Sequence, residues 1–166
     1  MAEISGNPWS FTSSDQATSA SISSIVRNGQ GSALITTSGA HGIAVDAYIS
    51  VQGTTTEKGW RGGYRVLMVP STTTLLVGIT PQQSLLANNG ANGTVLTAAY
   101  TQLIEVTQML WDGPTAADVL SLTDLTGRLV WNPTAVTGGS YTYMKSFPIF
   151  GLVLNAIPSG KLQISV

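Results

Sequence analysis

The stretch Asp46-Ala47-Tyr48-Ile49-Ser50-Val51-Gln52 alternates apolar and polar side chains along its length. A β-strand turns successive side chains to opposite faces, so this pattern places Ala47, Ile49 and Val51 together on one buried face. The C-terminal stretch Lys161-Leu162-Gln163-Ile164-Ser165-Val166 repeats the same alternation. Two half-buried strands so far apart in the chain predict an all-β protein.

Runs of β-branched and aromatic residues bounded by Gly, Pro and Ser extend this pattern along the chain. No segment longer than about ten residues sustains the 3.6-residue period of a helix. We therefore expect one or two small antiparallel β-sandwich or barrel lobes, jelly-roll-like in character. The expected strands are residues 32–37, 46–52, 64–69, 74–79, 102–111, 118–122, 127–131, 141–146, 149–155 and 161–166.

The expected domain boundaries follow the turn-forming residues. Residues 1–20 are polar apart from a few aromatics and are expected to form an extended N-terminal arm, which packs on its own domain or reaches a neighbouring subunit. Residues 21–80 form the expected first β lobe and residues 94–166 the second. Residues 81–93 contain two Asn-Gly steps, which favour turns because Asn and Gly tolerate positive φ. We expect this segment to be a linker.

Charged residues are scarce, whereas hydroxyl-bearing residues are abundant. Asp, Glu, Lys and Arg make up 9% of the chain, compared with about 25% in an ordinary globular domain. The sequence contains 18 serines and 21 threonines. A surface of hydroxyls costs less to desolvate than a surface of unpaired ions. Such a surface suits permanent contact with other protein subunits, and the alternative is a monomer that is merely neutral.

Several classes of partner are not expected. The seven Lys and Arg residues are scattered and the net charge is −1, so the clustered cations that bind nucleic acid are missing. The chain has no cysteine, which removes disulfides, Cys-based zinc sites and thiol chemistry. No apolar run is long enough to span a bilayer, and residues 1–8 lack the features of a signal peptide. We expect no membrane partner and synthesis in the cytosol.

Residue patterns that carry catalysis are also missing. The single histidine, His41, lies in a Gly-Ala-His-Gly turn, and no Gly-x-Ser-x-Gly motif supports a nucleophile. Asp112, Asp118 and Asp124 recur at equal spacing, but they lack the dense packing of a calcium loop. Asp112 and Asp124 also occupy ordinary turn positions. We expect no enzyme, no catalytic residue, no metal site and no cofactor.

Large aromatic residues are the remaining candidates for binding. Four tryptophans could stack on sugar rings, which leaves a glycan-binding module as one hypothesis. The alternative is that they anchor the core or a protein interface. The candidate interface residues are Trp9, Phe11, Trp111 and Trp131.

Two groups of segments carry a resemblance to tailed-bacteriophage virion proteins. Residues 40–43, 46–52 and 64–74 resemble a small β module in which a His-Gly-apolar turn precedes a strand, a loop and a strand entering a Pro-Ser-x-Thr-Thr turn. That module usually has Gly-Asp after the His-Gly turn, whereas this chain has Val45-Asp46 without the glycine. Residues 123–131, 147–152 and 158–160 resemble small β-sandwich proteins encoded among phage head and tail genes.

The resemblance implies a structural role in the virion, assembled in the host cytoplasm. Capsid cement or decoration proteins share the size, the all-β character and the lack of cysteine. They commonly form homotrimers over junctions of the major capsid protein, which is the partner implied here. A tail, baseplate or head–tail adaptor protein is the nearest alternative.

Overall fold

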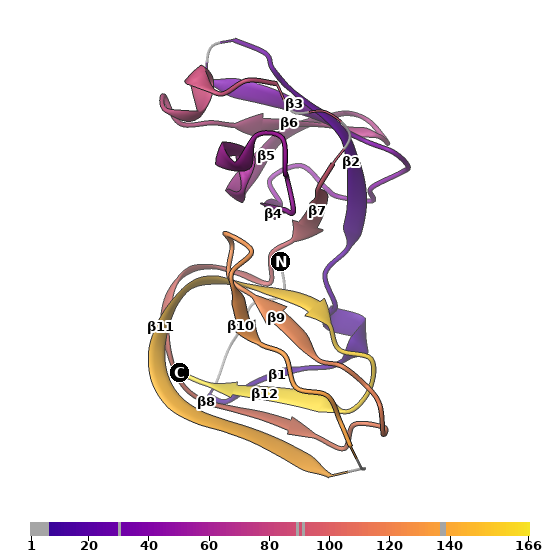
Figure 1. Ribbon diagram of the computed structural model, residues 1–166, viewed down its shortest axis with the longest axis vertical. Helices are drawn as coiled ribbons and strands as arrows, with labels where there is room; N and C mark the ends of the chain where they lie inside the picture. The colour runs from indigo at the N-terminus through magenta and orange to yellow at the C-terminus, as the bar shows by residue number, and fades with distance from the viewer. Residues whose placement is uncertain (1–6, 30, 89, 91, 137–138) are drawn as a thin grey trace. The chain divides into compact units, whose positions relative to one another are not determined.

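The computed structural model describes residues 7–29, 31–88, 90, 92–136 and 139–166 of the chain. The fold is all-β, as the alternating segments predict (Figure 1). Within those ranges the helical pieces are short 3-10 turns at Ser13–Asp15 (η1), Lys58–Trp60 (η2) and Gln83–Leu85 (η3).

The chain folds into two structural units, and neither unit is continuous in sequence. The sheet unit comprises Met1–Ala17, Ala99–Asp124 and Arg128–Val166. The barrel unit comprises Thr18–Ala98 together with the short segment Leu125–Gly127.

Six antiparallel strands close into the barrel, in the order β2-β3-β6-β5-β4-β7. Closure comes from β7, which pairs with β4 on one side and with β2 on the other. Buried apolar side chains fill the interior around the fully enclosed Trp60. The strands are β2 (Ser19–Arg27), β3 (Ser32–Thr37), β4 (Tyr48–Gln52), β5 (Gly62–Ser71), β6 (Thr74–Gly78) and β7 (Thr94–Thr97).

The sheet unit contains a second antiparallel sheet with the order β1-β12-β8-β11-β9-β10. Its core gathers around Trp111 and Met109, which are fully buried. The strands are β1 (Trp9–Phe11), β8 (Tyr100–Asp112), β9 (Ser121–Thr123), β10 (Leu129–Trp131), β11 (Ser140–Ala156) and β12 (Lys161–Ser165).

The long strand β11 connects the two ends of this sheet. Its first part pairs with β8, where Ser140 lies opposite Asp112, and its last part pairs with β9. Register shifts interrupt both ladders, and Gly151 adopts a φ of 72° within one of them. The strand therefore bends round the core instead of ending, as the curved ribbon in Figure 1 shows. Residues 141–146 and 149–155, expected as two strands, belong to this one strand.

The structure places the unit boundaries differently from those expected from turn residues. The expected linker, residues 81–93, packs in its described part on the barrel unit, where the Ala87 carbonyl accepts a hydrogen bond from Trp60 Nε1 at 2.8 Å. Residues 94–97, expected to open the second lobe, form β7 of the barrel. The physical reason is that β7 closes the barrel by pairing on both sides, which no local pattern of four residues records.

Two predicted side-chain orientations also differ from the observed ones. Ser50 was expected on the solvent face of β4, but it is buried, and its hydroxyl donates a hydrogen bond to the Leu125 carbonyl at 2.8 Å. Regular alternation along the strand expected at residues 102–111 would place Leu110 on the same face as Ile104 and Val106. Instead the buried positions of β8 shift by one residue between Val106 and Met109, beside the register shift in β11, and Leu110 lies only partly buried.

Candidate assembly surface

Three of the four predicted anchor residues lie in the core of the sheet unit. Trp9 and Phe11 belong to the edge strand β1, which pairs with β12, and both side chains are buried. Trp111 is fully buried, and its Nε1 donates a hydrogen bond to the Ser159 carbonyl at 2.8 Å. These three candidate interface residues instead hold the chain's own fold, and Trp9–Phe11 covers an edge that β12 would otherwise leave open. The N-terminal aromatics thus pack on their own domain.

The fourth predicted anchor, Trp131, is half-buried at the end of β10. Its ring centroid lies 6.3 Å from that of Tyr143 on β11. Trp60 is buried in the barrel, as Trp9 and Trp111 are in the sheet unit. Three of the four tryptophans therefore have no free face for a sugar ring, which weakens the glycan-binding hypothesis.

The outer face of β8 and β11 exposes large apolar side chains that the sequence did not single out. Leu103 and Phe150 are register partners, so their side chains lie side by side on one face of the sheet. Leu103 is 67% exposed and Phe150 is 54% exposed. Met144, which is 77% exposed, lies further along β11 opposite Gln108. Single exposed apolar residues are ordinary, whereas adjacent large ones mark interaction surfaces.

Little charge interrupts the neighbourhood of this pair. Glu105 lies opposite Pro148 in the same ladder, and its carboxylate accepts a hydrogen bond from the Ser146 hydroxyl at 2.6 Å. The only local signal in the sequence is that apolar residues occupy both faces of these strands, since exposed Leu103 and Phe150 adjoin buried Ile104 and Ile149. We call the exposed set Leu103, Met144 and Phe150 the apolar face.

The histidine and aspartates that the sequence raised as chemical candidates are tied into turns. His41 is buried, with Nδ1 accepting from the Ile43 N–H at 2.9 Å and Nε2 3.3 Å from the Ser71 carbonyl. Asp118 accepts hydrogen bonds from the Thr115 N–H and from the Ser159 hydroxyl. Among the described residues, no group of three or more His, Cys, Asp or Glu side chains is placed to hold a metal ion.

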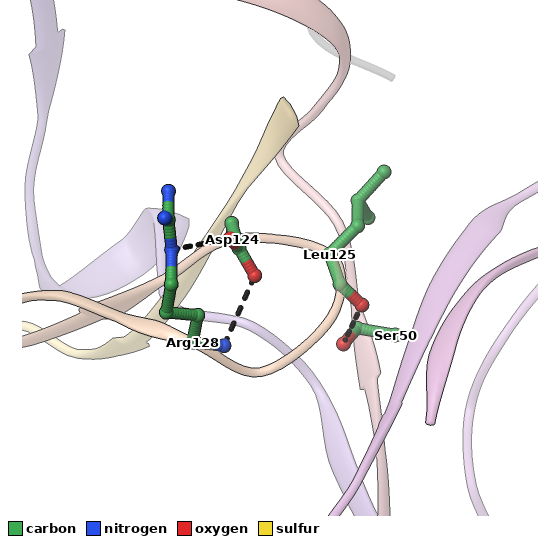
Figure 2. A network of polar contacts seen from close by, with 4 residues as sticks. All are labelled: Ser50, Asp124, Leu125 and Arg128. Carbon is green, nitrogen blue, oxygen red and sulfur yellow. Dashed lines mark hydrogen bonds and ion pairs between the residues drawn. The ribbon is translucent and has the colours of Figure 1, made fainter. Parts of the chain in front are cut away.

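Asp124 organises the hairpin connection between β9 and β10, which confirms the turn position expected for this residue. Its buried carboxylate accepts from the Arg128 N–H at 3.0 Å and from Arg128 Nε at 3.1 Å (Figure 2). At the tip, the Leu125 carbonyl accepts the hydrogen bond from Ser50 that Figure 2 also shows. The carboxylate thus fixes a loop shape and holds the Arg128 side chain.

Tyr64 is a buried polar group in the barrel unit. Its hydroxyl donates to the Trp60 carbonyl at 2.7 Å and accepts from Gln83 Nε2 at 2.8 Å. Burial raises the pKa of the Tyr64 phenol above its ordinary value, because desolvation disfavours the phenolate. Both hydrogen-bonding roles are satisfied by the protein, so this group stabilises the fold.

No helix in the described ranges has the length and apolar character needed to cross a membrane. Comparison with protein-family models, curated protein sequences and solved structures returned no match to this chain. Function is therefore inferred from the surface itself and from the resemblance carried by the sequence.

Proposed function

We propose that this chain is a non-enzymatic structural protein of a tailed-phage particle that acts by binding other protein subunits. The observation that carries this proposal is the apolar face, above all the adjacent pair Leu103 and Phe150. Covering such side chains removes apolar area from water, which stabilises a complex by about 25 cal/mol for each Å². The low content of charged residues, 9%, reduces the cost of desolvating the surrounding surface.

Within the particle, the proposed role is that of a capsid cement or decoration protein. The resemblance supports a homotrimer that binds across junctions of the major capsid protein. Area buried across those junctions would stabilise the assembled shell by mass action, because the protein binds the assembled state and not the separated subunits. A tail, baseplate or head–tail adaptor protein would use the same kind of surface in fewer copies.

The copy number per particle tests this proposal. Particles of the phage that encodes the chain are purified and analysed by quantitative mass spectrometry, with the major capsid protein as the internal standard. A cement protein is expected at on the order of hundreds of copies, and a tail or adaptor protein at a few to roughly tens. A particle preparation without the chain would contradict a structural role in the virion.

A further inference from the structure

The sheet unit contains a groove between β10 and the first part of β11. Its volume is about 380 Å³, and the described residues that line it belong to these two strands or, in the case of Arg128, directly precede β10. Strand β10 is the last strand of the sheet order, and the first part of β11 pairs with β8 alone. Among the described residues, the groove is therefore bordered by two strand edges that pair with no further strand.

Two cations border this groove. Arg128 is held by Asp124 through its Nε, while its two terminal nitrogens point away from that carboxylate (Figure 2). The Arg128 side chain is 67% exposed, whereas that of Asp124 is 7% exposed, so the guanidinium faces solvent although it is paired with Asp124. Within the part of the chain that the structure describes, Lys145 makes no ion pair. The groove thus offers an incoming anion the unpaired charge of Lys145, together with the terminal nitrogens of Arg128 as further hydrogen-bond donors.

The rest of the lining is aromatic and aliphatic. Tyr143 and Phe147 meet edge to face, with ring centroids 5.5 Å apart. Leu129, which is 58% exposed, and Pro148 complete the apolar lining. A sugar site needs several polar groups to bind ring hydroxyls. This lining has no Asn, Gln, Asp or Glu, so it favours a carboxylate beside an apolar side chain, as in an acidic peptide.

The strand edges themselves are poorly suited to pairing with another strand. Lys145 lies in the register shift between Met144 and Phe147, and Pro148 has no N–H to donate. Lysine, proline and bulges are the features by which sheet edges avoid strand addition. A partner in this groove is therefore held by side-chain contacts and charge, and not by backbone pairing.

We propose that the groove between β10 and β11 binds an acidic, apolar-containing peptide segment of a partner protein. Lys145 pairs with its carboxylates, the terminal nitrogens of Arg128 donate hydrogen bonds to them, and Tyr143, Phe147 and Leu129 contact its apolar side chains. This inference rests on the proposed function in taking the partner to be protein, and it names the chemistry by which that partner is recognised.

The test measures binding of the whole protein to a fluorescein-labelled peptide of sequence Gly-Glu-Leu-Glu-Leu-Glu by fluorescence anisotropy at low salt. Lys145→Gln is expected to weaken binding by about threefold to fivefold, and Lys145→Glu by about tenfold. Lys161→Gln is the matched control, since Lys161 is an exposed strand lysine of the same unit that does not border the groove. Added salt weakens binding to the wild type.

Three results would overturn the inference. They are no binding of the acidic peptide, an equal loss in Lys161→Gln, or tighter binding of a hyaluronan octasaccharide than of the peptide. The last result would mark an anionic-glycan site instead. Failure of peptide binding can be distinguished from failure of the proposed function, because the Lys145 variants leave the apolar face intact. The oligomeric state of these variants and their copy number in particles are measured separately from peptide binding.

Discussion

At the scale of single residues, Tyr64 offers a test of the buried polar structure in the barrel unit. Burial raises the pKa of its phenol, whereas an unfolded tyrosine ionises near pH 10. Above about pH 10 the unfolded state therefore binds fewer protons than the native state. The free energy of unfolding should then fall by about 1.4 kcal/mol per pH unit from this residue alone. Below pH 10 this contribution is fully present.

Tyr64→Phe isolates this contribution. Near neutral pH the free energy of unfolding of the variant should be lower than that of the wild type by about 1–2 kcal/mol. The reason is that the Trp60 carbonyl and the Gln83 amide each lose a buried hydrogen-bond partner. As the pH rises above 10, the difference in the free energy of unfolding between wild type and variant should shrink, since only the wild type has a phenol at position 64 that ionises on unfolding. Urea unfolding at a series of pH values measures this difference. A gap that stays constant into the alkaline range would contradict the assignment.

The burial of individual residues was predictable where the alternation of apolar and polar residues is regular and where the residues that bury a side chain are close to it in sequence. Ile49 and Val51 are buried as their spacing in β4 predicts. Ser50 was not predictable, because its cover comes from Leu125, 75 positions later in the chain. The same holds for Trp9 and Phe11, whose burial depends on pairing with the C-terminal strand.

At the scale of elements, the turn between β11 and β12 depends on Gly160. Its φ is 73°, and a Cβ atom there would lie 2.5 Å from the Asp112 carbonyl oxygen. Gly160→Ala should therefore destabilise the protein by about 2 kcal/mol or more. Gly113→Ala is the matched control, because Gly113 has a similar φ of 66° but open space around it. The urea midpoint of unfolding measures the stability of both variants. Equal losses of stability would rule out the collision with the Asp112 carbonyl oxygen as the cause.

The apolar face also belongs to the scale of elements, because the pairing of β8 with β11 brings its residues together. Leu103→Ser combined with Phe150→Ser should weaken subunit association at least about tenfold. The fold should survive, because both side chains are exposed and exposed substitutions usually change stability by about 0.5 kcal/mol or less. Sedimentation velocity over a concentration series measures the association.

The control for this pair is Val26→Ser combined with Leu85→Ser, which removes exposed apolar side chains from the barrel unit instead. If the Leu103 and Phe150 variant associates as strongly as the wild type, the apolar face is not the contact. The same conclusion follows if the control variant loses association equally.

Elements with a strong internal pattern were predicted, and elements defined by their neighbours were not. Strand β3 occupies the predicted residues 32–37. Strands β1 and β7 have three and four residues, too few to show a period, and exist because adjacent strands pair with them. The apolar face was missed for a related reason, because alternation reveals the buried face of a strand but not whether its outer face is also apolar.

At the scale of the whole molecule, the division into units was the least predictable feature. Each unit is assembled from separate stretches of the chain, and the segment Leu125–Gly127 belongs to the barrel although it lies inside a hairpin of the sheet unit. Turn-forming residues in the sequence predict unit boundaries at turns, whereas the observed boundaries follow the pairing of strands. The all-β class and the expectation of small β-sandwich or barrel lobes did not depend on those boundaries.

The proposal that this protein assembles with copies of itself is tested by the molar mass of the purified chain in solution. Multi-angle light scattering of the purified wild type over a concentration series is expected to give a stable mass of three chains. A larger closed ring would keep the claim and favour an adaptor or tail position. A protein that remains monomeric at every concentration would contradict the proposed homotrimer.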